Sequence, residues 1–472
     1  MDILDKDAVD LLADLREGRT TCAAVMAATL ERIEAVNGAV NAIVALRDSD
    51  TLMAEARAAD ARGAQGALWG LPFAVKDLEP LAGVVQTDGS PLFADRVAEV
   101  DSPMVAHLRA EGAIFVGKTN VPEFGLGSHS INPVYGVTRN PYDSNRTAGG
   151  SSGGAAAALA TRMVALADGS DMMGSLRNPA AFCNVYGFRP GWGVVPRAPG
   201  GETFLQQLST NGPMARSPRD LALLMSVMAR PNLAVPHNAA VQDWTLNAPE
   251  KLDGVRIGWL GDWGGAYSME EGVLAQCEQG LSVFEGIGAE LETVAPPFAA
   301  EDLWHSWTVL RHWAVASDLA PLYSDPATRA QLKPAAVWEI ENGLTLTGQQ
   351  IAKAAALRSR WFTLLAGLFD TYDFLALPSA QVWPFPAKWD WPQKIAGAQM
   401  DTYHRWMEVV VPVSLAGVPC ISLPCGFSDQ GLPMGVQLFA RKGADLSLLN
   451  VAQTYHEATL WPQKSPPHIH DG

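Results

Sequence analysis

Two groups of serines and one lysine are the residues of this chain whose types and spacing best suit catalysis. Ser151 and Ser152 lie in the sequence GGSSGG, Ser175 ends the sequence DMMGS, and Lys76 ends the apolar run LPFAVK. A serine hydroxyl needs an adjacent base to act as a nucleophile, and a lysine amine can be that base once burial lowers its pKa. No histidine near these serines belongs to a triad motif. The set therefore predicts a serine nucleophile that is activated by lysine.

Each of these residues also has an ordinary structural explanation. The serines of GGSSGG fit the N-cap of an alanine-rich helix that we predict over residues 153–166, Ser175 fits a tight turn, and Lys76 fits a strand end that reaches solvent. Side chains alternate along a strand, so Asp77 should point away from Lys76 and leave the lysine facing a dry interior. The occurrence of all three features in one chain favours catalysis over three separate structural roles.

A phosphate-binding loop is the first alternative that the motifs raise. Residues 112–119, GAIFVGKT, match the pattern GxxxxGK[ST]. The four middle positions should form a loop whose N–H groups bind phosphate, but here they are an apolar β run whose N–H groups belong in a sheet. Pro122 then interrupts the helix whose N-terminus should hold the phosphate. We therefore do not expect nucleotide binding.

A nucleophile elbow is the second alternative, because GGSSG satisfies the pattern GxSxG. An α/β-hydrolase needs a buried strand directly before that turn, whereas the polar sequence NPYDSNRT precedes it here. The triad would also need a histidine after the serine. His404 and His456 are available, although neither stands in a motif. This chemistry stays open as the less favoured alternative.

Composition bounds the possible partners of the chain. The 472 residues are 48% hydrophobic and carry a net charge of −16, which argues against a nucleic-acid partner. The five cysteines are odd in number and scattered, so reduced thiols fit better than disulfides or a zinc site. The start of the chain does not resemble a signal peptide, and no run of about twenty apolar residues predicts a membrane span. We expect a cytoplasmic protein with no metal, no cofactor and no membrane partner.

The order of apolar patterns predicts an α/β fold in one domain over residues 1–472. Residues 1–62 have helical periodicity, and short apolar runs alternate with helical segments after them. Strands that alternate with helices imply a central mixed, largely parallel β-sheet with helices on both faces. Residues 63–230 hold the serines and lysine, and residues 299–400 form a tryptophan-rich lid or pocket region. The runs expected as strands are residues 71–75, 113–116, 255–259 and 374–377.

The chain closely resembles the amidase signature family of serine amidases, and the resemblance extends over nearly its whole length. The shared motifs are long and stand in the family's order. They are GLPFAVKD (70–77), GKTNVPEF (117–124), TRNP (138–141), GGSSGG (149–154), GSDMMGSLR (169–177), PAAFC (179–183), GFRP (187–190), LAGVP (415–419) and GLPMGVQL (431–438). The resemblance implies the amidase signature fold.

The resemblance also implies a Ser–cis-Ser–Lys triad and an acyl-enzyme mechanism. Ser175 would be the nucleophile, Ser151 the bridging serine after a cis peptide bond, and Lys76 the base. The family pattern assigns the oxyanion hole to backbone N–H groups of Met172, Met173 and Gly174, together with that of Ser175 itself. It assigns supporting roles to Ser152, Asp171 and Arg177, and the wall of the substrate pocket to Gly125, Leu126 and Gly127.

One position departs from the family pattern. The family commonly has two glycines directly before its nucleophile, whereas this chain has Met173 and Gly174. The backbone donors survive this change, so we still expect activity. The side chain of Met173 must point away from the oxyanion, or it narrows the pocket.

The expected reaction is hydrolysis of a carboxylic amide to an acid plus an amine or ammonia. Six tryptophans in the lid region could form aromatic walls, which suit an aryl or bulky apolar amide, but packing explains them equally well. A carbamate or ester hydrolase with the same site stays open. So does the glutaminase subunit of a transamidosome, although no basic and acidic pair for glutamine is identifiable, and a homodimer is a possible assembly. The tryptophans are Trp304, Trp307, Trp313, Trp383, Trp389 and Trp391.

Overall fold

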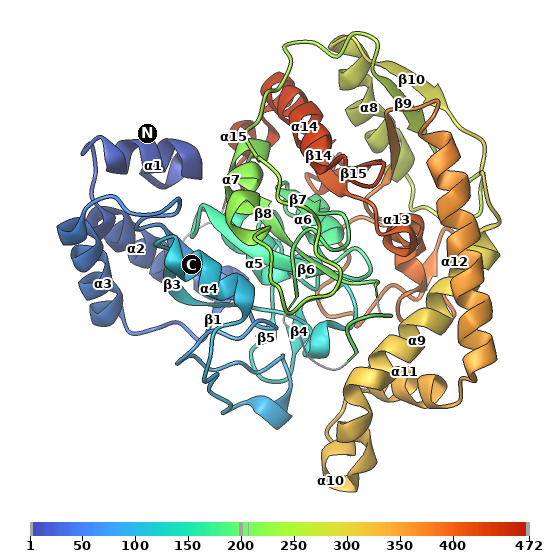
Figure 1. The fold of residues 1–472 in the computed structure, drawn as a ribbon, viewed down its shortest axis with the longest axis horizontal. Helices are drawn as coiled ribbons and strands as arrows, with labels where there is room; N and C mark the ends of the chain where they lie inside the picture. Colours follow the sequence, from blue (N-terminus) through green and yellow to red (C-terminus); the bar gives the residue numbers. More distant parts are fainter. Residues whose placement is uncertain (1–2, 198–201, 206, 469–472) are drawn as a thin grey trace.

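One mixed sheet of eleven strands runs through the computed structural model, which describes residues 3–197, 202–205 and 207–468 (Figure 1). In spatial order its strands are β1 (Ile43–Val44), β3 (Ile114–Thr119), β2 (Pro72–Lys76), β6 (Leu166–Asp171), β8 (Thr210–Ala215), β7 (Tyr186–Arg189), β14 (Cys420–Phe427), β15 (Pro433–Ala440), β11 (Phe374–Pro378), β9 (Arg256–Trp259) and β10 (Glu290–Thr293). Two small hairpins lie outside it, β4 (Ile131–Asn132) with β5 (Gly136–Val137) and β12 (Lys394–Ile395) with β13 (Ala398–Gln399).

The strands pair in parallel on either side of an antiparallel middle, and the short edge strand β1 is antiparallel to β3. β3, β2 and β6 are parallel, as are β11, β9 and β10, whereas every pairing from β6 to β11 through β8, β7, β14 and β15 is antiparallel. The α/β fold with a mixed sheet is therefore confirmed, but the expectation of a largely parallel sheet is wrong for the middle. Parallel pairing needs a crossover connection, and β14 and β15 are joined by a short turn instead.

The four apolar runs expected as strands form β2, β3, β9 and β11. The helix predicted over residues 153–166 is too long, because α5 (Gly153–Ala160) ends six residues earlier and Leu166 begins β6. Arg162 adopts a left-handed φ of 62°, which a right-handed helix cannot continue through. Leu166 then pairs with strands on both of its sides, so tertiary pairing overrides the local helical preference.

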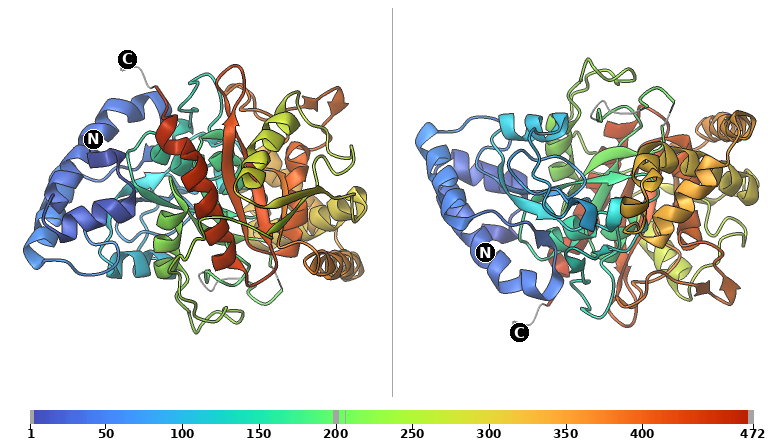
Figure 2. Two further views of the ribbon diagram at one scale, coloured as in Figure 1. Left: turned by 90° about the horizontal axis from the view of Figure 1, so that it is seen from above. Right: turned by 90° about the horizontal axis from the view of Figure 1, so that it is seen from below.

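Helices cover the sheet on both faces. α5 and α6 (Arg177–Phe182) contact one another and the central strands, whereas α7 (Pro218–Met228), α8 (Val273–Gly286) and α14 (Asp445–Thr459) form a separate layer, visible from above in Figure 2. The other helices are α1 (Ala8–Arg16), α2 (Cys22–Val40), α3 (Ser49–Arg62), α4 (Pro103–Ala110), α9 (Ala300–Ser324), α10 (Pro326–Arg329), α11 (Pro334–Leu344), α12 (Gly348–Leu368), α13 (Val411–Ala416) and α15 (Trp461–Lys464). Short 3-10 turns are η1 (Ile3–Asp5), η2 (Pro91–Phe93), η3 (Glu123–Gly125) and η4 (Arg405–Val410).

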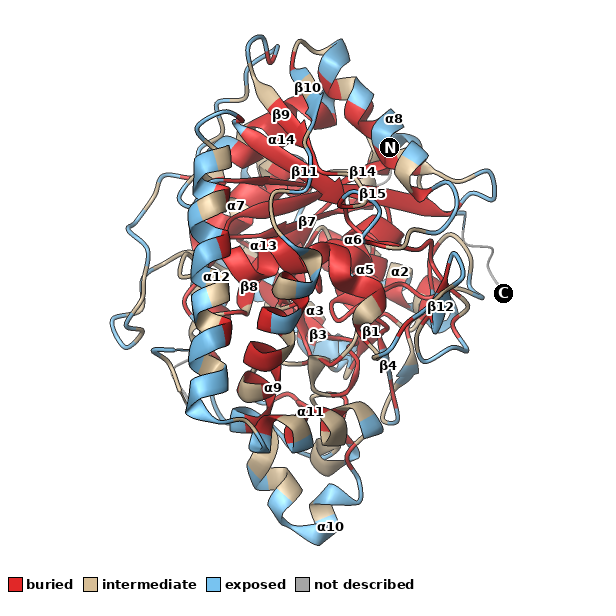
Figure 3. Cartoon of the chain, turned by 90° about the vertical axis from the view of Figure 1, so that its right-hand side faces the viewer, coloured by how far each residue is buried: buried red, intermediate tan, exposed pale blue. Residues whose placement is uncertain are grey.

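The two ends of the molecule are covered by different helices. The helices α1, α2 and α3 lie at one end and α9 to α12 at the other (Figure 1). The central strands are buried, whereas the edge strand β10 and the helices α10 and α12 present exposed residues to solvent (Figure 3). No helix in the described part of the chain is long and apolar enough to cross a membrane.

The buried helix α5 explains why the GGSSGG segment is rich in glycine. Every residue of α5 is buried. A Cβ at Gly154 would lie 2.2 Å from the backbone nitrogen of Asn120, so only glycine allows this close approach. The helix is thereby held against the end of β3, which fixes the position of Ser151 and Ser152 directly before it.

Candidate active site

Lys76 lies at the carboxyl end of β2 and contacts three serines. Its side chain is completely buried. Nζ lies 2.8 Å from the Oγ atoms of both Ser151 and Ser152, and 3.0 Å from Oγ of Ser170 on the neighbouring strand β6. The structure thus brings the lysine and the serine loop together as the sequence predicted.

Burial decides the protonation of this lysine. Desolvation lowers the pKa of Lys76 to about 7, against the opposing effect of the carboxylates of Asp168, Asp171 and Glu79. The next residue, Asp77, points elsewhere and accepts hydrogen bonds from Thr87. The alternation of side chains expected along this strand is therefore confirmed, and a neutral amine is accessible near pH 7.

The serine loop has the cis peptide bond that the resemblance implied, between Gly150 and Ser151. Ser152 occupies the N-cap position of α5, but its side chain does not cap the helix. Its hydroxyl accepts from Lys76 instead, and Ser130 Oγ accepts from the N–H of Gly153 at 3.1 Å. Helix capping therefore does not account for Ser152.

Ser175 lies between the end of β6 and the start of α6. Its side chain is 7% exposed and, like Ser151, it lines a cavity of about 160 Å³. The N–H of Ser152 donates to the carbonyl of Ser175 at 3.2 Å, which holds the two serine loops together. Within the described residues, no hydrogen bond joins the hydroxyls of Ser151 and Ser175.

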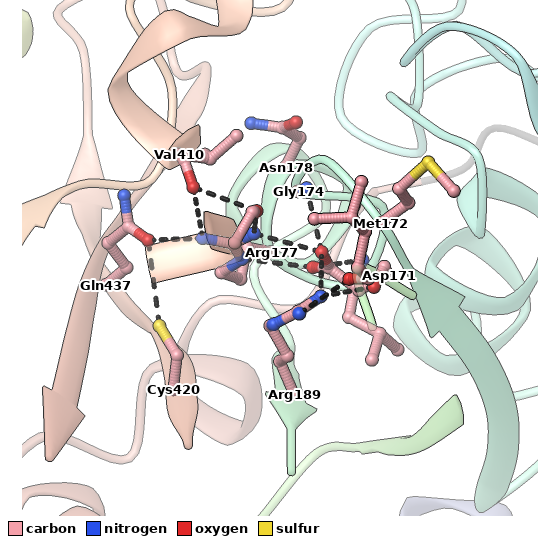
Figure 4. Close-up of polar contacts among 12 residues, drawn as sticks. Asp171, Met172, Gly174, Arg177, Asn178, Arg189, Val410, Cys420 and Gln437 are labelled. Atoms are coloured by element: carbon pink, nitrogen blue, oxygen red, sulfur yellow. Dashed lines mark hydrogen bonds and ion pairs between the residues drawn. The ribbon is translucent and has the colours of Figure 1, made fainter. Parts of the chain in front are cut away.

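The loop before Ser175 is fixed by a buried carboxylate between two guanidinium groups (Figure 4). The carboxylate of Asp171 accepts hydrogen bonds from Nη2 of Arg177 at 2.9 Å and from Nη1 of Arg189 at 3.0 Å. All three side chains are completely buried. Although burial raises it, the two arginines together hold the pKa of Asp171 well below its usual range. The same carboxylate accepts from the N–H groups of Gly174 and Leu176, at 2.9 Å and 3.1 Å.

Two observations bear on the predicted oxyanion donors. Because the N–H of Gly174 already donates to Asp171, it is not directed at a bound substrate. Met173 is 3% exposed and packs into the hydrophobic core, although it also contributes to the cavity wall. Met172 is partly buried, and its Sδ lies 3.2 Å from Nη1 of Arg311.

The predicted glycine and leucine wall residues line the cavity that holds Ser151 and Ser175, but the predicted tryptophan walls do not. Gly125, Leu126 and Gly127 all line it. None of the six tryptophans does so among the described lining residues. Trp304 and Trp307 are buried in the core, and Trp391 lines a different cavity of about 700 Å³ beyond Leu126 and Gly127. The aromatic-wall interpretation is therefore wrong, and the packing interpretation accounts for most of these side chains.

Several site residues were not identified from the sequence. Ser170 and Asp168 share one face of β6, so strand alternation could have placed both of them beside Lys76. Arg189 stands in the motif GFRP, and nothing in that motif indicates its pairing with Asp171. Four charged residues, two of each sign, line the cavity: Glu79, Arg197, Arg311 and Asp318. Arg311 and Asp318 lie two turns apart on α9, whereas Glu79 and Arg197 come from segments that no local pattern relates to that helix.

Both motif alternatives fail against the geometry. The residues AIFV belong largely to β3, and Lys118 is buried and donates to the carbonyl of Glu79, not to a phosphate loop. Residues 138–152, ahead of the serine loop's helix, contain no strand of the kind that a nucleophile elbow requires. Neither His404 nor His456 lines the cavity, and burial lowers the pKa of His404 to about 3 and that of His456 to about 4.

Comparison with known proteins agrees with this arrangement. A family model described as Amidase matches residues 24–449. An acylamidase of Rhodococcus erythropolis is 31% identical over 468 residues, which cover 97% of this chain and 96% of that protein. A Glutamyl-tRNA(Gln) amidotransferase subunit of Thermosynechococcus vestitus is 34% identical and covers 93% of this chain and 95% of its own length. The crystal structure of a bacterial aryl acylamidase of the amidase signature family superposes with a TM-score of 0.91 at 27% identity, covering 98% of this chain and 99% of that one.

The fold, the buried lysine and serines and these matches define the class of protein: the chain belongs to the amidase signature family and is an amide hydrolase. Its relatives include an acylamidase and a Glutamyl-tRNA(Gln) amidotransferase subunit, whose names specify different reactions.

Proposed function

We propose that this enzyme hydrolyses a carboxylic amide to an acid and an amine or ammonia through an acyl-enzyme on Ser175. The observation that carries the proposal is the 2.8 Å contact between the buried amine of Lys76 and Ser151 Oγ, in a cavity that Ser175 also lines. An amine with a pKa of about 7 can act as a base at neutral pH, which an exposed lysine cannot.

The proposed proton path uses the two serines in series. Neutral Lys76 accepts the proton of Ser151, and Ser151 takes the proton of Ser175 as that hydroxyl attacks the amide carbonyl. The proton returns through Ser151 to the leaving nitrogen, which departs as the C–N bond breaks. Water then adds to the acyl-enzyme by the same path in reverse and releases the acid.

The oxyanion is proposed to bind the backbone N–H groups of Met172, Met173 and Ser175. The N–H of Gly174 is left out of this set because Asp171 already accepts it. One such donor contributes roughly 3 kcal/mol to the transition state. Ser152, Asp171 and Arg177 position the lysine and the loop and do not react with substrate.

The substrate that we propose is an acyl amide with an aryl amine as leaving group. Its support is the likeness to an acylamidase and to an aryl acylamidase, both over nearly the whole chain. Leu126 and Val315 provide apolar surface in the cavity. A carbamate or an ester would use the same nucleophile and base, so these remain alternative substrates.

A glutaminase subunit is the second candidate, and one structural observation favours it. Glutamine carries a carboxylate and an ammonium group, and the cavity has side chains of both signs, Arg311 and Arg197 beside Glu79 and Asp318. The likeness to amidotransferase subunits supports the same candidate. A protein of this kind should depend on its partner for activity.

Turnover by the purified chain tests these candidates. Acetanilides, the matched phenyl carbamates and esters, and L-glutamine would be compared by release of aniline, phenol or ammonia. We expect the anilide to be cleaved without a partner and Ser175→Ala to abolish its cleavage, whereas Ser209→Ala, a matched hydroxyl in the same cavity, should retain it. Full activity of Ser175→Ala, or turnover of glutamine alone, would contradict the proposal.

We further propose that the enzyme acts in the cytoplasm without a membrane or nucleic-acid partner, and as a homodimer. The free, buried thiols of its five cysteines suit a reducing compartment, and the net charge of −16 disfavours nucleic acid. Light scattering during gel filtration tests the assembly, because a dimer has twice the chain mass of 50.4 kDa and a monomer would contradict it.

A further inference from the structure

Arg311 is a buried cation at the wall of the catalytic cavity that the proposed mechanism does not use. It projects from α9, in the lid region, and its side chain is only 4% exposed. It lines the same cavity as Ser151 and Ser175. Since desolvating a guanidinium is costly, a group in this position needs a structural or functional reason.

Residues from two other segments fix the orientation of this guanidinium. Nε donates to Glu339 of α11 at 2.6 Å, and Nη2 donates to the hydroxyl of Tyr403 at 2.6 Å. Tyr403 donates in turn to the same Glu339 oxygen at 2.6 Å. The plane of the guanidinium is therefore set before any ligand arrives, which reduces the entropy lost on binding.

The remaining nitrogen, Nη1, has a poor partner. In the described part of the chain its acceptor is the Sδ atom of Met172, at 3.2 Å, and a thioether is a weak acceptor. Met172 lies three residues before Ser175 and also lines the cavity. An oriented N–H donor thus faces a weak acceptor close to the nucleophile.

The charges around Arg311 indicate which kind of acceptor would fit. Glu339 already compensates its positive charge directly. Among the described lining residues, Glu79 and Asp318 balance Arg311 and Arg197, so the cavity has no excess of positive charge for a carboxylate. A neutral oxygen, such as a ketone or amide carbonyl, would accept from Nη1 without adding another anion.

We propose that Arg311 is a specificity-determining residue, whose Nη1 binds a neutral carbonyl oxygen that the substrate carries in addition to its scissile amide. The inference rests on the proposed amide hydrolysis and narrows its substrate class to acyl amides with a second carbonyl in the acyl chain. Substrates that lack this oxygen would leave a buried donor with only the thioether and would be cleaved more slowly.

Matched pairs of anilides test this assignment. Each pair has one acyl chain with a ketone two, three or four carbons from the scissile carbonyl and one chain with a methylene group in its place. We expect at least one ketone member to exceed its methylene analogue by about tenfold or more in kcat/KM, because a hydrogen bond to a charged donor has that effect. Arg311→Lys should reduce this preference to about threefold or less, since a lysine ammonium lacks the planar guanidinium that Glu339 and Tyr403 hold in one orientation.

A second variant and a control distinguish loss of the Nη1 hydrogen bond from a general disturbance of the cavity. Arg311→Met with Glu339→Gln removes both charges of the buried pair and should also lose the preference while still cleaving the methylene anilide. Arg197→Met removes the exposed cation of the same cavity and should keep the preference. A preference that survives Arg311→Lys, or is lost in Arg197→Met instead, would overturn the assignment.

Binding to Ser175→Ala separates this inference from the proposed function. Calorimetric titration of that variant measures the ketone and methylene ligands without turnover. Tighter binding of the ketone, lost when Arg311→Lys is added, supports the assignment even if the reaction is not amide hydrolysis. Equal binding of all pairs, or stronger binding of an analogue with a carboxylate in place of the ketone, overturns it.

Discussion

The substitution Asp171→Asn tests whether the carboxylate of Asp171 holds the loop that precedes Ser175, the proposed nucleophile. Asp171 is completely buried between Arg177 and Arg189, which are themselves completely buried. The amide would keep the shape of the side chain but remove its charge and turn one acceptor into a donor that faces a guanidinium. Removing one partner of a buried ion pair costs about 3–5 kcal/mol, because an uncompensated charge is left in the interior. We expect the free energy of unfolding to fall by about that amount.

Urea denaturation followed by tryptophan fluorescence measures this loss. The control is Glu301→Gln, which removes one of the two carboxylate partners of Arg405, in a pair whose glutamate is 79% exposed. That change should cost about 1 kcal/mol or less. The N–H groups of Gly174 and Leu176 would also lose part of their acceptor, which loosens the loop around Ser175. The reaction of Ser175 with a fluorophosphonate should therefore be slower in the folded variant than in the parent enzyme. A loss in Asp171→Asn no larger than that of the control would refute the reasoning.

Three further predictions concern the reacting groups. The value of kcat/KM should rise with pH through about 7 and level off above it, because Lys76 must lose its proton before it can act as the base. Lys76→Ala should lower the rate by several decades and remove this rise with pH. A flat pH profile in the parent enzyme would contradict the assignment of Lys76 as the base. Ser151→Ala should lower kcat by roughly a hundredfold or more with a near-normal melting temperature, since it interrupts the proton path; activity within about tenfold would exclude a bridging role. His404→Ala and His456→Ala should each keep kcat within about tenfold of the parent enzyme, as measured by turnover after titration of the active sites of the folded molecules. Loss of turnover in either variant would support a histidine as the base.

The sequence was sufficient to predict that Lys76 and the serine loop lie together, because the features that place them are short local motifs. Lys76 ends a buried strand, and the glycines around Ser151 allow close packing that larger residues would prevent. The cis bond and the contact between Lys76 and Ser151 followed from the family resemblance. Strand order in the middle of the sheet did not follow from it, because β6 with β8, β7 with β14 and β11 with β15 are pairings between strands that are not consecutive in the chain.

The cavity wall beyond Gly125, Leu126 and Gly127 could not be predicted from the sequence. Tryptophans in α9 have the same helical spacing whether they face the core or the substrate, and in the structure Trp304 and Trp307 face the core. Arg311 lies on the same helix and faces the cavity because Glu339 and Tyr403, which are distant in sequence, fix its side chain. Such tertiary pairings leave no periodic signal in the sequence.

Covalent labelling with a fluorophosphonate tests the central claim most directly. Intact-protein mass spectrometry would show whether one adduct forms, and peptide mapping would place it on a residue. Our account predicts a single adduct on Ser175, formed faster as pH rises through about 7 because Lys76 becomes neutral. An adduct on Ser151 or Ser152, or a chain that remains unlabelled while it hydrolyses amides, would contradict the account.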